Sequence, residues 1–250
     1  MDNLDKIVSQ YRMIYDHHTH TTFSHGKGSI EDNVKVAVEK GLKSIAITDH
    51  GPGHLTYGID RNKIKVMRDE IERLKLVYPQ IEILLGVEAN TLRVAPYIDL
   101  TEDEKKDLDI VLAGYHFGIL RAGMVPNYIS NHTGLFAGDS SSLKVANTAM
   151  ILNALYENDI AILTHPGDKG PFDIEDIAKA CVDTNTMIEI NAKHKHLTID
   201  EIKLASKYDV KFVIGSDAHI SSKVGSFEEP LKRALEAGLD PERIVNIEKI

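Results

Sequence analysis

The chain has 250 residues, of which 42% are hydrophobic, and this is enough to bury the core of one barrel-sized α/β domain. Its formal net charge of −9 argues against broad binding to nucleic acid or anionic membranes, because both require a basic surface. The single cysteine, Cys181, excludes an intramolecular disulfide and is expected to be a buried thiol. Because no stretch approaches ~18 unbroken apolar residues, we expect a cytoplasmic protein with no membrane partner.

Short apolar runs alternate with amphipathic segments of helical period, which is typical of βα units repeated around a parallel sheet. Seven runs are predicted as strands, at residues 14–18, 44–48, 81–87, 110–115, 161–164, 187–190 and 211–215. Six segments are predicted as helices, at residues 30–40, 62–78, 143–158, 174–184, 199–208 and 228–237. We expect one domain over residues 1–250, with 1–13 as an N-terminal extension. Two longer irregular stretches, 51–60 and 117–142, are expected to be lids or binding loops.

Six of the predicted strands end in side chains that are good metal ligands. Active sites of parallel α/β barrels lie at this end of the strands, where the βα loops converge. Because side chains alternate along a strand, His18 and His20 share one side while His17 points to the other. Such a pair can bind one ion from a rigid backbone. The strand-end candidates are His18, His20, His50, Glu88, His116, His165, Asp217 and His219.

Imidazole and carboxylate ligands together suit Zn, Mn or Fe, whereas Mg and Ca sites favour oxygen ligands throughout. A single four-ligand ion would leave several of these side chains without a role. Two or three ions are therefore expected, with a carboxylate such as Glu88 as a bridge. Ions about 3.5–4 Å apart can clamp the attacking and leaving oxygens of phosphoryl transfer and lower the pKa of bound water toward about 7. The pattern favours a hydrolase.

Six ordered motifs contain these ligands and extend to their neighbours in the sequence. They are Asp-His-His-Thr-His-Thr at 16–21, Ile-Ala-Ile-Thr-Asp-His-Gly-Pro at 45–52, Gly-Val-Glu-Ala-Asn at 86–90, Ala-Gly-Tyr-His at 113–116, Thr-His-Pro-Gly at 164–167 and Gly-Ser-Asp-Ala-His at 215–219. Together they resemble the PHP (polymerase and histidinol phosphatase) family, and most closely its stand-alone phosphatase branch. The resemblance implies an α/β fold, a distorted (β/α)7 barrel similar to a TIM barrel, with a trinuclear and usually zinc-containing centre at the C-terminal ends of the strands.

The resemblance also implies a ligand set and an activity. One metal would be held by His18, His20, Glu88 and Asp217, a second by His25, His50 and His219, and a third by Glu88, His116 and His165. The implied cofactors are two to three Zn²⁺ ions, with Mn²⁺ or Fe as alternatives. The implied activity is hydrolysis of a small phosphomonoester by a metal-activated hydroxide, with His219, Asp217 and Glu88 as catalytic residues. A homo-oligomer would fit the same resemblance.

Other polar residues near the strand ends are harder to interpret. Asp16 is expected to accept a hydrogen bond from a ligand imidazole. His54 and His132 are expected at the surface, and His194 and His196 have no predicted role beyond a lid. The acidic stretch 97–109 is expected to be a solvated connection. Five basic residues could neutralise a substrate phosphate, although a solvated surface charge is the favoured interpretation of each one: Lys27, Arg93, Lys193, Lys195 and Lys223.

Three other functions stay open at this point. An amidohydrolase-type deacylase also uses a strand-end His-x-His and a late Asp, but the additional histidines fit a third metal better. A nuclease or polymerase-associated role is disfavoured, because the composition gives no basic groove for nucleic acid. A non-catalytic metal-binding protein is disfavoured by the complete set of ligands. The expected partner is a small phosphorylated substrate, whose identity depends on residues 51–60 and 117–142.

Overall fold

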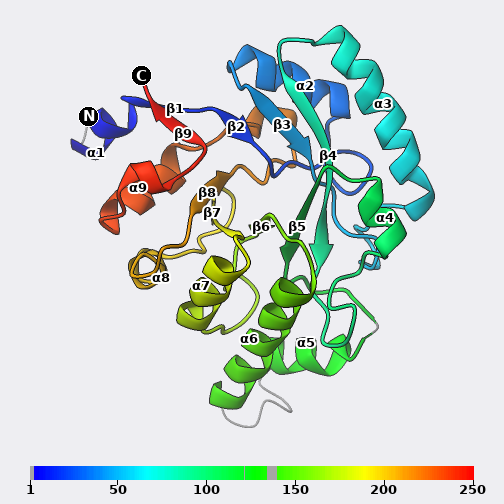
Figure 1. Ribbon diagram of the computed structural model, residues 1–250, viewed down its shortest axis with the longest axis vertical. Helices are drawn as coiled ribbons and strands as arrows, with labels where there is room; N and C mark the ends of the chain where they lie inside the picture. Colours follow the sequence, from blue (N-terminus) through cyan, green and yellow to red (C-terminus); the bar gives the residue numbers. More distant parts are fainter. Residues whose placement is uncertain (1–2, 121, 134–139) are drawn as a thin grey trace.

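A seven-stranded parallel sheet that curls into a nearly closed barrel forms the centre of the molecule (Figure 1). The computed structural model describes residues 3–120, 122–133 and 140–250. The strands lie side by side in chain order: β2 (Tyr15–Asp16), β3 (Ser44–Ile47), β4 (Glu82–Asn90), β5 (Ile110–Gly114), β6 (Ile162–Leu163), β7 (Met187–Asn191) and β8 (Phe212–Gly215). All seven predicted strands are present, and the distorted (β/α)7 barrel is confirmed.

The strands are apolar along most of their length because both faces of the sheet are covered. Every residue of β3 and of β8 is buried, as is typical of parallel strands packed on two sides. Paired positions on neighbouring strands point to the same face, so Leu112, which pairs with Glu88 and Ile162, lies on the Glu88 face. Leu112, Ile162 and Val213 form a small separate apolar cluster. This cluster lies on the face of the sheet that carries the polar site.

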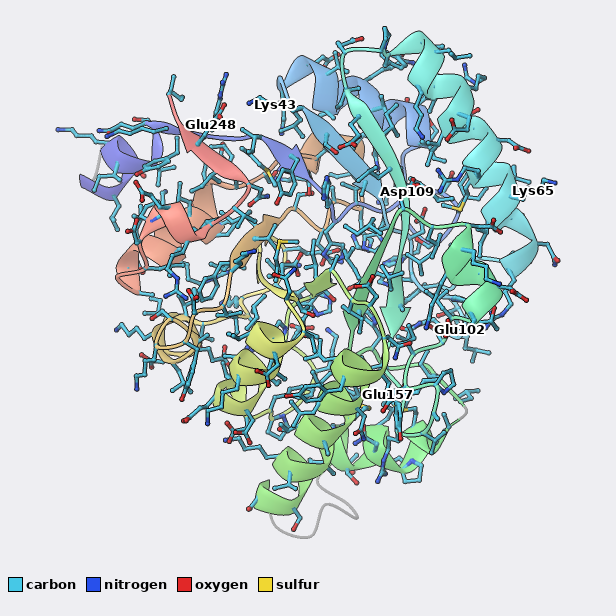
Figure 2. The ribbon with its side chains drawn as sticks, in the orientation of Figure 1. Lys43, Lys65, Glu102, Asp109, Glu157 and Glu248 are labelled. Atoms are coloured by element: carbon cyan, nitrogen blue, oxygen red, sulfur yellow. The ribbon has the colours of Figure 1, made fainter. Side chains whose placement is uncertain are left out.

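Helices surround the barrel (Figure 1), and charged side chains such as Lys65, Glu102 and Glu157 lie on the outside (Figure 2). The six predicted helices are present with ends shifted by a few residues: α2 (Ile30–Glu39), α3 (Ile64–Val77), α6 (Ser140–Glu157), α7 (Ile174–Asp183), α8 (Ile199–Ala205) and α9 (Glu228–Glu236). The 3-10 turns are η1 (Arg61–Lys63), η2 (Ser221–Lys223) and η3 (Pro241–Arg243). Within the described ranges, no helix is both long and apolar enough to cross a membrane.

Two predictions of irregular structure differ from the structure. The stretch 117–142 contains α5 (Met124–Thr133) and the start of α6, while residues 121 and 134–139 lie outside the described residues. The stretch 97–109 is not simply a solvated connection, because Ile98, Asp99 and Leu100 are buried before α4 (Glu102–Lys106) begins. The many acidic residues of this stretch led to the prediction that all of it is exposed to solvent.

The first residues of the chain pack against the last ones. Helix α1 (Asn3–Val8) contacts α9, and β1 (Tyr11–Met13) pairs in antiparallel register with β9 (Ile247–Lys249). The two ends of the chain therefore lie close together, at one side of the barrel (Figure 1). This small two-stranded sheet was not predicted, because each of its strands is only three residues long.

Side chains, rather than a regular ladder, join the first strand of the barrel to the last. Asn246 donates from Nδ2 to the carbonyls of Tyr15 (2.9 Å) and Ile214 (2.7 Å), and its Oδ1 accepts from the Ile214 N–H (2.9 Å). Asp16 accepts the N–H groups of Ser216 (3.2 Å) and Gly225 (2.8 Å). These bonds bring the ends of β2 and β8 together, and with them the polar residues that follow each strand.

We expect Asn246→Ala to lower the free energy of unfolding by about 2–4 kcal/mol, because it leaves buried backbone groups of two strands without partners. Chemical denaturation measures this loss. The matched control is Asn62→Ala at an exposed position, where we expect a change within about 0.5 kcal/mol. Equal effects of the two substitutions would contradict the importance of the β2–β8 junction.

Candidate metal centre

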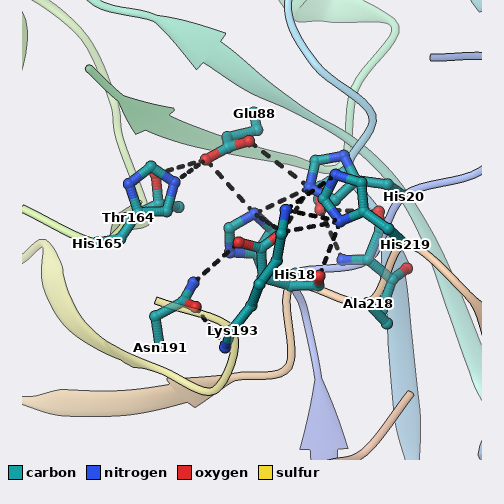
Figure 3. A network of polar contacts seen from close by, with 12 residues as sticks. His18, His20, Glu88, Thr164, His165, Asn191, Lys193, Ala218 and His219 are labelled. Carbon is teal, nitrogen blue, oxygen red and sulfur yellow. Dashed lines mark hydrogen bonds and ion pairs between the residues drawn. The ribbon is translucent and has the colours of Figure 1, made fainter. Parts of the chain in front are cut away.

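The described residues contain a dense cluster of histidines and acids at the C-terminal ends of the barrel strands (Figure 3). Five groups of three such side chains have ligand atoms within 4.8 Å of one another. The groups share members, so the cluster is continuous. It brings together eight of the predicted ligands: His18, His20, His50, Glu88, His116, His165, Asp217 and His219.

Glu88 on β4 lies at the centre of the cluster and is fully buried. Its Oε1 is 2.9 Å from His165 Nε2, and its Oε2 is 2.9 Å from His50 Nδ1. The other rings within 3.6 Å of its carboxylate oxygens are those of His18, His20 and His116. A carboxylate with each oxygen facing different imidazoles has the arrangement that bridging between two ions requires.

Several buried atoms of the cluster and of the adjoining His25 have no hydrogen-bond partner, which is costly unless something else binds them. They are His20 Nδ1, His25 Nδ1, His50 Nδ1, His116 Nε2 and Glu88 Oε2. His50 Nδ1 and Glu88 Oε2 are only 2.9 Å apart, yet neither atom has a hydrogen-bond partner. Imidazole nitrogens and carboxylate oxygens in this arrangement fit metal ions such as Zn, Mn or Fe.

The protonation states suit metal binding at most of these positions. Burial alone would raise the pKa of Glu88 and of Asp217, but the adjacent histidines hold both values well below their usual range. Burial lowers the pKa of His50 to about 3 and that of His25 to about 4. At neutral pH these carboxylates are ionised and these imidazoles neutral, which are the forms that bind metals.

His18 differs from the other rings because of Glu189, a residue that the sequence did not single out. Burial would lower the pKa of His18, but Glu189 and the cluster carboxylates raise it well above its usual value. Glu189 Oε1 lies 2.5 Å from His18 Nδ1, so the opposite nitrogen, Nε2, faces the cluster. A carboxylate in this position fixes the ring and increases its basicity as a ligand. The only sequence signal was a lone acid in the apolar strand β7.

The position of Gly215 allows this contact. A Cβ atom on Gly215 would lie 1.9 Å from Glu189 Oε1, so any larger residue would displace the carboxylate. The predicted role of Asp16 as the acceptor for a ligand imidazole is wrong. Its oxygens accept backbone N–H groups at the β2–β8 junction instead, and Glu189 on β7 takes the role that was predicted for it.

Other buried polar residues orient the remaining rings. Asn90 Oδ1 lies 2.9 Å from His116 Nδ1, and Asn90 Nδ2 donates to Asp99 Oδ2 at 2.6 Å. The buried Asp99 in the stretch 97–109 therefore positions His116 through Asn90. Asp49 accepts the N–H of Thr21 at 2.7 Å and also the hydroxyl of Ser24. This contact holds the loop that carries the next predicted ligand, His25.

His25 lies beside the cluster but outside the five groups of close ligand atoms among the described residues. Its ring stacks on that of His50 with centroids 4.8 Å apart, and it contacts the ring of His219 at 4.2 Å. Tyr57 covers its other side at 4.3 Å. The structure thus brings His25 to the edge of the cluster, where the ring is partly exposed.

The histidines without a predicted ligand role divide into two sets. His17 stacks on Tyr15 away from the cluster, His132 is exposed, and His196 pairs with Glu201 at 3.0 Å. His54 and His194 instead line a cavity of about 280 Å³ above the cluster, so the expectation that His54 lies at the surface was incomplete. A larger cavity of about 590 Å³ adjoins the cluster at His219 and Asp217 and continues toward the start of α9.

His194 is held between two carboxylates. Its Nδ1 lies 2.9 Å from Asp168 Oδ1, and its Nε2 lies 3.3 Å from Asp217 Oδ2. Burial opposes protonation of this ring, but the two acids raise its pKa to about 9. His194, His165 and Asp217 form one of the five groups of ligand atoms, which makes His194 the one member of the cluster that was not predicted.

The PHP domain matches residues 16–240, and the chain therefore belongs to the PHP family. A relative from Thermoanaerobacter sp. (strain X514), named "probable phosphatase", is 33% identical over 94% of this chain and 91% of its own length. A second "probable phosphatase", from Shewanella halifaxensis (strain HAW-EB4), is 30% identical over 94% of this chain and 89% of its own length.

A solved structure has the same fold. Histidinol phosphate phosphatase from Lactococcus lactis subsp. lactis Il1403, complexed with zinc, L-histidinol and phosphate, superposes with a TM-score of 0.62. The two sequences are 16% identical, and the superposition covers 91% of this chain and 95% of that one. At this identity the likeness supports the fold of the barrel alone.

We expect Glu189→Gln to weaken metal binding about 10–100-fold, because a neutral amide orients His18 less strongly and no longer increases its basicity. Competition with a chelator of known affinity measures this change. Glu82→Gln, at the exposed start of β4, is the matched control and should bind metal as the wild type does. If Glu189→Gln bound metal with wild-type affinity, His18 would not need a carboxylate at Nδ1 to act as a ligand.

We expect the paired His194 to make the metal-free protein more stable in acid than in base. Its pKa is raised on folding, so its contribution is fully present below about pH 6.5 and is lost as the pH rises through about 9. After allowance for solvent screening, this contribution is about 1–2 kcal/mol. Denaturant unfolding at about pH 6 and about pH 10 should show a smaller pH dependence in His194→Gln than in wild type.

The control for this comparison is His132→Gln, which replaces an exposed histidine outside the groups of close ligand atoms. We expect its free energy of unfolding to follow that of the wild type at both pH values. An unchanged pH dependence in His194→Gln would mean that the two carboxylates do not stabilise the charged ring.

Proposed function

We propose that this chain is a metal-dependent phosphatase that hydrolyses a small phosphomonoester. The observation that carries the proposal is the continuous cluster of carboxylates and imidazoles around Glu88, in which several buried atoms lack hydrogen-bond partners. Membership of the PHP family and the names of its relatives support phosphate ester hydrolysis. Two cavities meet the cluster, so a small substrate can reach it.

The ligand atoms are numerous enough for three ions. We propose one ion at His18, His20, Glu88 and Asp217, one at His25, His50 and His219, and one at Glu88, His116 and His165. One of the five close groups, His18, His20 and Asp217, lies within a single proposed site, whereas the other four combine ligands of different sites or include His194. Zinc is the ion that we favour, because one structural relative was solved with zinc and the donor set suits it.

Bound ions would polarise the phosphoryl oxygens and lower the pKa of a water molecule toward about 7. The residues of the chain supply the remaining functions. Glu88 and Asp217 provide the buried negative charge that holds cations, and the strand ends keep the imidazoles in fixed positions. His219 is partly exposed where the cluster opens into the larger cavity, so it is the catalytic candidate nearest to a leaving group.

We expect the purified protein to contain two to three Zn, Mn or Fe ions and to release phosphate from small phosphomonoesters. Phosphate release from a panel of monoesters and diesters, with and without chelator, tests this expectation. Activity should disappear with the metals and return when Zn²⁺ or Mn²⁺ is added back. Asp217→Asn should lower metal affinity about 10–100-fold and activity with it. Asp209→Asn, at an exposed position, is the matched control.

The same assay separates the alternatives. Acyl esters and amides test for a deacylase, and a single-stranded oligonucleotide tests for a nuclease. Cleavage of either in preference to phosphomonoesters would replace the proposed function. Full metal content without any hydrolysis would favour a binding role, and full activity after complete metal removal would contradict the metal-dependent reaction.

A further inference from the structure

One ammonium group lies against the candidate metal centre. Lys193 Nζ is 3.1 Å from His219 Nδ1, 3.2 Å from His219 Nε2 and 3.5 Å from Asp217 Oδ1. Among the residues that the structure describes, it is the one lysine nitrogen within ion-pair distance of a predicted metal ligand. Figure 3 shows its side chain running from beside Asn191 toward His219. A protonated lysine has no lone pair to offer a metal, so metal binding does not account for its position.

The position of Lys193 distinguishes it from the other basic residues near the strand ends. Its side chain lines both the larger and the smaller cavity, whereas Lys27 and Lys223 line only the larger one. Lys195 lies two residues further along the same segment and lines a different hollow on the outside of the barrel. Lys169 reaches the smaller cavity, but it is already paired with Asp168.

Hydrogen bonds hold the backbone of Lys193, while its side chain is partly exposed. Asn191 Oδ1 accepts the N–H groups of Lys193 (2.8 Å) and His194 (2.7 Å), and Asn191 Nδ2 donates to Glu189 Oε2 (2.9 Å). The turn after β7 is thereby tied to the carboxylate that orients His18. The side chain of Lys193 is 42% exposed and flexible, so its charged end can follow an anion at the junction of the cavities.

The hydrogen bond made by His219 determines whether the Lys193 ammonium can also bind this ring. His219 Nδ1 lies 2.9 Å from the Asp217 carbonyl, an acceptor, which leaves Nε2 as the nitrogen with a lone pair. The lone pair on Nε2 can accept a hydrogen bond from the Lys193 ammonium or bind a cation, but not both at once. When it binds a cation, repulsion directs the ammonium away from the ring and toward an anion in the adjoining cavities.

We propose that Lys193 binds the phosphoryl group of the substrate where the two cavities meet. This inference rests on the proposed function and adds one substrate-binding residue to it. The phosphate would lie between the cation-binding cluster and the ammonium, and the organic part would occupy the larger cavity. Lysine is well suited to this role because it binds phosphate as a compact point charge.

The test uses the metal-loaded protein and inorganic phosphate as the probe, measured by isothermal titration calorimetry. We expect Lys193→Met to raise the Kd for phosphate about 10–100-fold, as removal of a charge-assisted contact does. The KM for a phosphomonoester should rise with it, while kcat falls less. Lys193→Arg, which keeps the charge, should retain most of the affinity. The matched control is Lys195→Met, with phosphate affinity and KM as in wild type.

Metal content is measured in every variant, because a purely structural lysine would change it. Unchanged phosphate affinity in Lys193→Met, loss of metals in that variant, or an equal effect of Lys195→Met would each overturn the inference. A wild-type protein that does not bind phosphate would overturn it as well. If the wild type binds phosphate through Lys193 but hydrolyses no monoester, the proposed function fails and this inference stands.

Discussion

The buried carboxylate of Glu88 is the constraint on which the rest of the site depends. An ionised carboxylate without exposure to water is very costly unless positive charge or hydrogen bonds surround it. In this barrel, imidazoles from other strands surround it, together with the hydroxyl of Thr164 at 2.7 Å. In the metal-free cluster, the positive charges of His18 and His194 offset part of the carboxylate charge, because both rings have a raised pKa. The buried imidazole nitrogens and the Glu88 oxygen that have no hydrogen-bond partner are the atoms that a cation would bind.

The contacts that close the barrel between β2 and β8 also bring together residues of the candidate metal centre. His20 follows the first strand of the barrel and Asp217 follows the last, and the bridge between Thr19 and Ala218 brings them together. This junction has no regular ladder, so its geometry depends on the side chains of Asp16 and Asn246. A small displacement there would separate ligands that belong to one proposed ion. The polar residues buried at the junction thus stabilise the fold and determine the distances within the cluster.

The sequence was sufficient to predict the strands and most of the cluster, because both follow from short-range patterns. Apolar runs of the right length end in histidines or acids, and parallel strands bring their ends to one edge. Glu189 and Asp99 were not predicted, because each acts through a partner distant in sequence and only the folded chain shows the contact. The helix α5 was not predicted either, since its asparagines and serine resemble a loop. Its Asn127 is buried and bonded to Tyr115 and to Asn147 on α6, so tertiary contacts stabilise it.

The strand ends and the connecting segments contribute different parts of the candidate site. Residues at the strand ends have little freedom, because the barrel fixes their backbone and buried carboxylates fix their rings. The groups that line the cavities beyond them, such as His54 and Lys193, come from connecting segments and are more exposed. Changes in these segments can alter the shape and charge of the cavities without moving Glu88 or Glu189. The barrel therefore fixes the geometry of the ligand cluster, while connecting segments, including the one after β8, line the two cavities beside it.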